Sequence, residues 1–264
     1  MYAHQVIEDL KMLGHKEFIK GQRALSEFFI DKIRKSQQFH FGKMENLPFD
    51  EERRDEIWEL SRRYWKQPYM TCWFDFLWRG EETGRHYLMA MLCEDDGTET
   101  TLNLFFKSMP SGIWLWCGTF FMTRQTIGHY PYLLRVAIPP YFGQEQEDAG
   151  KLMCNEYLRL LILLNCKNVE AQRVFPHIKA HNKRVKKGLE GLFEYHVLKI
   201  SHDLKSSVAS AKSGSMNRLH LCRGHFKEYT EEAPLMGKHV GLYFWQPHVR
   251  GRNKKGIVIK DYEF

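Results

Sequence analysis

The chain has 264 residues, of which 43% are hydrophobic and 14% are aromatic, and its formal net charge is +7. This composition excludes extended disorder and is sufficient for a sizeable folded core. No apolar run approaches the roughly 20 residues that a membrane-spanning helix needs, and the first residues lack the pattern of a signal peptide. We therefore predict a cytoplasmic protein with no membrane partner. The six scattered cysteines form no Cys-x-x-Cys pair, which predicts reduced, buried thiols.

Charge is divided unevenly along the chain. Residues 165–264 hold 19 Lys and Arg against 9 Asp and Glu, a net charge of +10, whereas residues 1–164 have a net charge of −3. An acidic front and a basic back indicate a folded body that carries a part facing a polyanion. The alternative is a solvated basic surface that serves solubility.

Apolar spacing predicts helices in the first 66 residues. Residues 3–37 repeat apolar side chains every three or four positions, with bends expected at Gly14 and Gly21. A connector over 39–49 contains Pro48, and Asp50 is a candidate cap for a second helix over 53–64.

The apolar pattern changes to strands over residues 69–138. Short polar turns separate five candidate strands, at 70–78, 86–93, 100–107, 113–122 and 133–138. Such turns favour an antiparallel meander with the helices on one face. A central helix follows at 147–165, apolar all round from Leu160 to Leu164, and 195–200 indicates a further strand.

The predicted fold class is therefore α+β, with an α+β body over residues 1–200. Residues 201–216 are rich in serine and predict a flexible linker. The remaining residues, 217–264, are predicted to form a small basic β module.

A basic stretch without acidic residues covers 176–188. It is a candidate phosphate-contacting loop, through Lys183, Arg184, Lys186 and Lys187. The alternative is an exposed crossing on the surface.

The stretch 219–251 gathers the residue types that carry chemistry. It interleaves four histidines with basic and aromatic residues, among them Arg223, Lys227, Tyr229, Lys238, Trp245 and Arg250. In one interpretation the cations meet RNA phosphates while Tyr243, Phe244 or Trp245 stacks on unpaired bases. In a structural alternative, the histidines satisfy backbone groups of a small β module and Arg223 pairs with Glu228 or Glu231.

Two further interpretations of the same stretch involve catalysis or metal. His225 and His248 could act as base and acid in metal-independent RNA cleavage, with Arg223 stabilising the developing charge. His220, Cys222, His225, His239 and His248 could supply zinc ligands, but the paired knuckles of zinc fingers are missing. We predict no metal site and no cofactor.

Several separated motifs resemble a family of phage- and prophage-encoded proteins. They are Leu164-Asn165-Cys166-Lys167-Asn168-Val169, Asn182-Lys183-Arg184 with Gly188, Tyr195 to Ile200, His220-x-x-Arg223-Gly224-His225 and Trp245-x-x-His248-Val249-x-Gly251. The Arg-Gly-His piece also resembles the tail of a type V anti-CRISPR inhibitor that lowers synthesis of its target nuclease. The family has a second arginine where this chain has Cys222.

The resemblance implies a mobile-element accessory protein that acts on RNA or on translation in a bacterial cytoplasm. We therefore expect RNA or a ribonucleoprotein as the partner, bound through the basic C-terminal half. The alternatives are a metal-independent endoribonuclease and an inhibitor that binds a host defence protein.

Overall fold

The computed structural model describes most of the chain. The described residues are 2–15, 22–43, 54–79, 86–107, 111–127, 131–139, 144–200, 218–222, 224–245, 248–250 and 252–258. Within these ranges the chain forms five helices, a large mixed sheet and two small sheets, which confirms the α+β class. No helix in these ranges is long and apolar enough to span a membrane.

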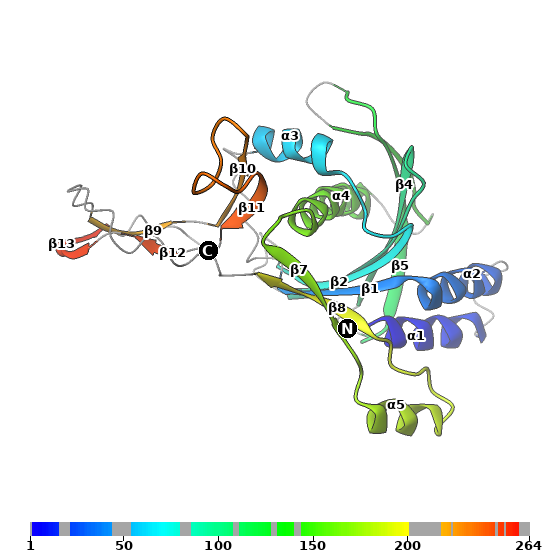
Figure 1. Cartoon of the computed structure of the whole chain (residues 1–264). Coiled ribbons are helices and arrows are strands. Elements are labelled where there is room, and N and C mark those ends of the chain that lie inside the picture. The colour runs from blue at the N-terminus through cyan, green and yellow to red at the C-terminus, as the bar shows by residue number, and fades with distance from the viewer. Residues whose placement is uncertain are drawn as a thin grey trace.

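An eight-stranded sheet forms the centre of the molecule (Figure 1), in the order β6-β5-β4-β3-β2-β1-β8-β7. Its strands are β1 (Gln37–Lys43), β2 (Thr71–Arg79), β3 (His86–Asp95), β4 (Glu99–Lys107), β5 (Trp114–Thr123), β6 (Leu133–Ala137), β7 (Val169–Val174) and β8 (Tyr195–Ile200). Every neighbouring pair from β2 to β6 is antiparallel, so the predicted meander is confirmed.

The sheet is larger than the predicted meander. Residues 39–43, expected in a connector, belong to β1, which pairs in parallel with both β2 and β8. The prediction failed because Phe39-His40-Phe41 is a short alternation that ends at Gly42, whose φ is +66°. β1 therefore joins the meander to the antiparallel pair formed by β7 and β8.

Helices cover both faces of the sheet, whereas the sequence predicted helices on one face only (Figure 1). The strand β2 shows the reason, because Trp73 packs with α1 and α2 while its neighbour Phe74 packs with α4. Such a strand is buried on both faces and needs cover on each. The covering helices are α1 (Ala3–His15) and α2 (Gln22–Lys35) on one side, and α3 (Arg54–Tyr64) and α4 (Gln144–Leu164) on the other.

The helix α4 lies against the sheet with very little clearance. Tyr157 and Leu161 are fully buried, and Gly150 faces the ring of Phe120. A Cβ added at Gly150 would lie 1.8 Å from Phe120 Cζ, so only glycine permits this approach.

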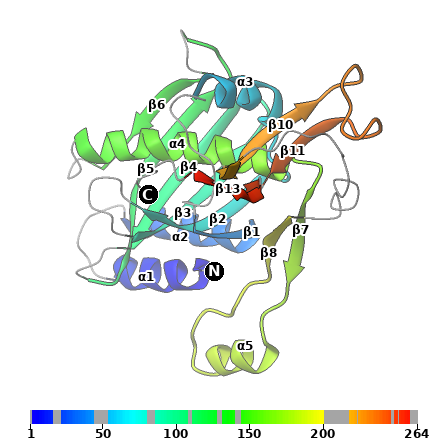
Figure 2. The same ribbon diagram turned by 90° about the vertical axis from the view of Figure 1, so that its left-hand side faces the viewer.

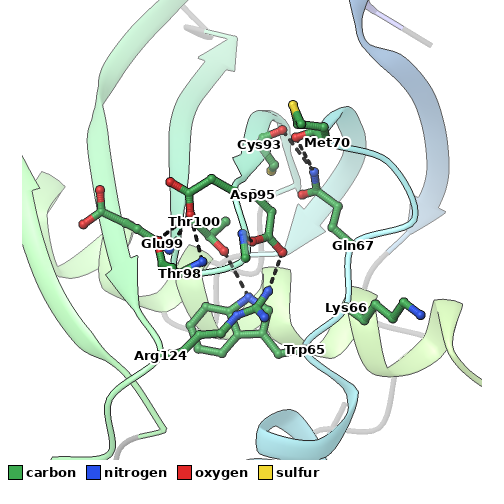
Figure 3. A network of polar contacts seen from close by, with 12 residues as sticks. Trp65, Lys66, Gln67, Met70, Cys93, Asp95, Thr98, Glu99, Thr100 and Arg124 are labelled. Carbon is green, nitrogen blue, oxygen red and sulfur yellow. Dashed lines mark hydrogen bonds and ion pairs between the residues drawn. The ribbon is translucent and has the colours of Figure 1, made fainter.

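A polar network joins the segment after α3 to the turn between β3 and β4 (Figure 3). The indole of Trp65 donates a 3.1 Å hydrogen bond to Thr100 Oγ1, and Arg124 lies over the Trp65 ring. The guanidinium of Arg124 also donates to Asp95 at 2.6 Å. These contacts hold the end of α3 against the sheet.

The described part of the predicted C-terminal module contains five strands. The strands β10 (His225–Tyr229) and β11 (Gly241–Trp245) form an antiparallel hairpin, and β12 (His248–Arg250), β9 (Arg218–Cys222) and β13 (Arg252–Val258) form a small sheet in that order. The hairpin shares an apolar cluster with α3 and α4, so this part of the module packs on the body. The predicted linker, 201–216, lies outside the described residues.

The strands β7 and β8 are joined by α5 (Ile178–Val185), which no sequence pattern predicted as a helix. We call residues 175–194 the α5 arm. It extends away from the sheet in both ribbon views (Figures 1 and 2).

Candidate functional site

The two faces of the β10–β11 hairpin differ in character. Phe226, Leu242 and Phe244 alternate onto the face that packs against α3 and α4, and each is at most 4% exposed. Because side chains alternate along a strand, the neighbouring residues lie on the opposite face. We call this opposite set the hairpin face, and its members are His225, Lys227, Tyr229, Tyr243 and Trp245.

The strand register brings basic and aromatic residues side by side on the hairpin face. His225 lies opposite Trp245, and Lys227 lies opposite Tyr243. The Tyr229 and Tyr243 rings meet edge to face with centroids 5.7 Å apart, and Lys227 Nζ lies 4.8 Å from the Tyr229 centroid. Residues 14 to 20 positions apart in the sequence thus form one continuous surface.

The aromatic residues differ in exposure. Tyr243 is 7% exposed and contacts the Tyr229 ring, while Tyr229 and Trp245 are partly exposed. Phe244 had been a candidate for stacking on bases, and its 4% exposure corrects that interpretation. Its ring packs on Phe226 at 5.2 Å within the apolar cluster.

The turn between α4 and β7 fixes the hairpin to the body. The Asn168 amide donates to Phe244 O at 2.7 Å, and Asn168 Oδ1 accepts from Phe244 N at 2.9 Å, as a strand residue would. The Asn165 amide donates to the carbonyls of Tyr64, Lys66 and Leu161. The segment 164–169 therefore has a structural role.

Glu228 alternates onto the inner side of the hairpin. It accepts hydrogen bonds from the guanidinium of Arg63 and, at 2.7 Å, from the Tyr64 hydroxyl. Burial and this hydrogen bond raise the pKa of Tyr64 to about 12. Glu228, a candidate partner of Arg223 in the sequence, is thus paired with Arg63.

The other predicted residues of the C-terminal stretch lie on several elements. Lys238 is exposed between β10 and β11. In the β9–β12 ladder, His248 lies opposite Cys222 and Arg250 lies opposite His220. His225 and His248, the candidate base and acid, belong to different sheets, and Arg223 lies outside the described residues. No group of three metal-ligating side chains occurs among the residues that the structure describes.

The four predicted phosphate-contacting residues of the arm have two different environments. Arg184 donates to Glu8 Oε1 at 2.5 Å and to the Glu190 carbonyl at 2.9 Å, so it anchors the arm. Lys183, Lys186 and Lys187 are exposed.

Sequence reasoning missed a polar pair in the sheet. Asp75, fully buried, accepts from Tyr2 N at 2.9 Å and from the Trp73 indole at 3.1 Å, and it lies 2.5 Å from His40 Nδ1. The sequence signal that could have identified this pair is a single acidic residue inside the otherwise apolar run Trp73 to Phe76. The rings of Tyr2 and Tyr195 flank His40, and the backbone of Tyr2 donates to Asp75. We therefore assign the Asp75–His40 pair to fixing the N-terminal segment on the sheet.

Five of the six cysteines, at positions 72, 93, 117, 154 and 166, have free thiols, and all of these but Cys117 are buried. Burial raises the pKa of Cys72 to about 12, so this thiol is protonated at neutral pH.

Comparisons with protein-family models, with curated proteins and with solved structures found no match.

Proposed function

We propose that this protein binds RNA through the hairpin face. The observation that supports the proposal is the cross-strand register that sets Lys227 and His225 beside Tyr229 and Trp245. Cations interleaved with partly exposed rings are the elements from which proteins build surfaces for single-stranded nucleic acid.

Each residue of the face has a role in such binding. Lys227 contacts phosphates, and His225 contributes a further polar contact beside it. Tyr229 and Trp245 offer ring faces to unpaired bases, and Tyr243 holds Tyr229 in place. A β surface that is fixed from behind, as this hairpin is by Asn168, presents its rings without further ordering.

The sequence resemblance supports a cellular setting for this binding. It favours a mobile-element accessory protein that acts on RNA, or on a translating complex, in a bacterial cytoplasm. The net charge of +10 over residues 165–264 is consistent with a polyanionic partner.

The test is fluorescence anisotropy of the full chain with a labelled mixed-sequence single-stranded RNA. We expect affinity that falls steeply with salt, and a loss of about tenfold in Trp245→Ala or Tyr229→Ala, since stacking contributes about 1–3 kcal/mol per base. The matched control is Tyr69→Ala, because Tyr69 is 47% exposed but lies outside the hairpin face. Equal losses in Tyr69→Ala and Tyr229→Ala, or the absence of binding, would contradict the proposal.

The same incubation, run on a gel with EDTA, tests the catalytic alternative. Intact RNA is the expected result. If the wild type cuts RNA in the presence of EDTA and His225→Ala does not, the binding proposal is replaced by the ribonuclease hypothesis, in which His225, His248 and Arg223 are the catalytic residues. A chain that neither binds nor cuts RNA would leave a host protein as the partner.

A further inference from the structure

The α5 arm carries large apolar side chains in solvent. Phe175 is 67% exposed, Ile178 is 65% exposed and Val185 is 51% exposed, and α5 has no buried residue. Isolated apolar residues are normal on a protein surface, but several together on one short segment indicate an interaction site. None of these three side chains belongs to an apolar cluster of the described residues, and the Phe175 ring is approached at 4.9 Å by the Arg173 guanidinium.

Lysines lie beside the apolar residues on α5. Ile178 and Val185, seven positions apart, share one side of the helix, and Lys179 and Lys183, four apart, share the adjacent side. Lys186 and Lys187 follow directly, and α5 contains no acidic residue. Within the described ranges, none of these four lysine side chains has an ion-pair or hydrogen-bond partner.

The third side of α5 is fixed to the rest of the molecule. Arg184 pairs with Glu8, and His181 Nδ1 lies 3.0 Å from Leu192 O. A Cβ added at Gly191 would lie 2.6 Å from His181 Cε1, so the returning chain packs closely under the helix. These contacts hold the helix with its apolar and lysine sides directed away from the body.

On the side of the molecule where the arm lies, no other described element extends as far from the sheet. Figures 1 and 2 differ by a turn about the vertical axis, and α5 is the lowest labelled element in both. The hairpin lies toward the opposite end in both views. A flat surface can therefore reach α5 without contacting the hairpin face.

We propose that the α5 arm is a docking surface for an anionic lipid bilayer. Ile178, Val185 and Phe175 enter the boundary between headgroups and acyl chains, and Lys179, Lys183 and Lys186 contact lipid phosphates at the same depth. The sequence predicted no membrane partner because no segment could span a bilayer, but a helix that lies in the interface needs no such segment.

An RNA backbone would satisfy the lysines but offers no apolar partner for Ile178 and Val185, which is why a lipid surface is favoured. The inference does not depend on RNA binding by the hairpin face, because the two surfaces share no residue.

The test is flotation of the full chain with vesicles of phosphatidylcholine alone or with about one-third phosphatidylglycerol. We expect binding to the anionic vesicles only. Lys179→Gln/Lys183→Gln should weaken it about 25-fold, since each lysine near an anionic surface contributes about a fivefold gain. Ile178→Ser/Val185→Ser should also weaken binding, and the binding that remains should be abolished by raised salt. All four positions are exposed, so both variants should keep the melting temperature of the wild type.

The matched control is Lys66→Gln/Lys238→Gln, which removes the same charge from exposed positions outside the arm. An equal loss in this control would show nonspecific adsorption and overturn the inference. The absence of binding to anionic vesicles would overturn it as well. An arm variant that lowers RNA affinity while vesicle binding is unchanged would reassign the lysines to RNA.

Discussion

The β10–β11 hairpin and the α5 arm both present basic residues beside aromatic or aliphatic ones, but apolar burial contributes much more to the attachment of the hairpin than to that of the arm. The hairpin buries Phe226, Leu242 and Phe244 in an apolar cluster with α3 and α4. The arm buries no residue of α5, and it is held by ion pairs and hydrogen bonds around Glu8 and Glu190 together with the partly buried Phe193, which packs on the cluster of α1 and α2.

This difference determines what each surface can offer a partner. A face held mainly by apolar burial behind it depends little on charge, and its outer side is available for polar recognition. An element held by charges at its base keeps its apolar residues uncovered for a partner. The two attachments should therefore respond to different substitutions and different conditions.

The largest expected effect is loss of the burial that fixes the hairpin. Phe244→Ala should lower the free energy of unfolding by about 4 kcal/mol, because a buried phenyl ring is replaced by a cavity. Urea denaturation measures this loss, and amide hydrogen exchange should show the hairpin opening before the rest. Phe175→Ala on the arm, where the ring is 67% exposed, should cost well under about 1 kcal/mol. Similar losses in both variants would show that the hairpin is not held by its inner face.

The next effect concerns the hydrogen bonds behind the hairpin. Asn168→Ala removes both partners of the Phe244 backbone and leaves a buried N–H and C=O unpaired, so we expect a loss of about 2 kcal/mol. RNA affinity should fall as well, because the strand that carries Trp245 is less ordered. Asn182→Ala, at an exposed position of α5, is the control and should change neither quantity. An Asn168→Ala variant with unchanged stability would contradict the structural role of the motif at 164–169.

The sequence predicted the meander because its turns are local signals, with Asp95, Asp96 and Gly97 marking one of them. It missed β1 and the second layer of helices, since both depend on partners distant in the chain: β1 pairs with β8, more than 150 residues away. The same limit applies to the hairpin face. Tyr229 and Trp245 were identified by type, but only the register shows that Phe244 points inward. The environment of Arg184 was equally invisible, because Glu8 lies 176 positions from it.

A smaller effect is expected at the base of the arm. Glu190 accepts hydrogen bonds from Lys11 Nζ at 2.7 Å and from Arg34 Nη2 at 2.8 Å. Glu190→Gln removes the charge from both pairs, and we expect a loss of about 1 kcal/mol with faster amide exchange in the arm but not in the hairpin. Glu194→Gln is the matched control, because Glu194 is paired only with the exposed Arg173. If amide exchange became faster to the same extent in the hairpin, the two attachments would be coupled.

Acid should erase the difference between wild type and Glu190→Gln. Hydrogen bonding from Arg34, followed by that from Lys11, lowers the pKa of Glu190 from its ordinary value of 4.5 to about 2. A carboxylate with a depressed pKa stabilises the folded state above its unfolded pKa, and this contribution is lost as pH falls through the folded pKa. The free energies of unfolding should therefore differ most above about pH 5 and converge between pH 4.5 and 2. Urea denaturation of both proteins across this range measures the convergence, and the other carboxylates titrate alike in both. A difference that stayed constant down to the lowest pH would mean that Glu190 contributes through packing and not through its charge.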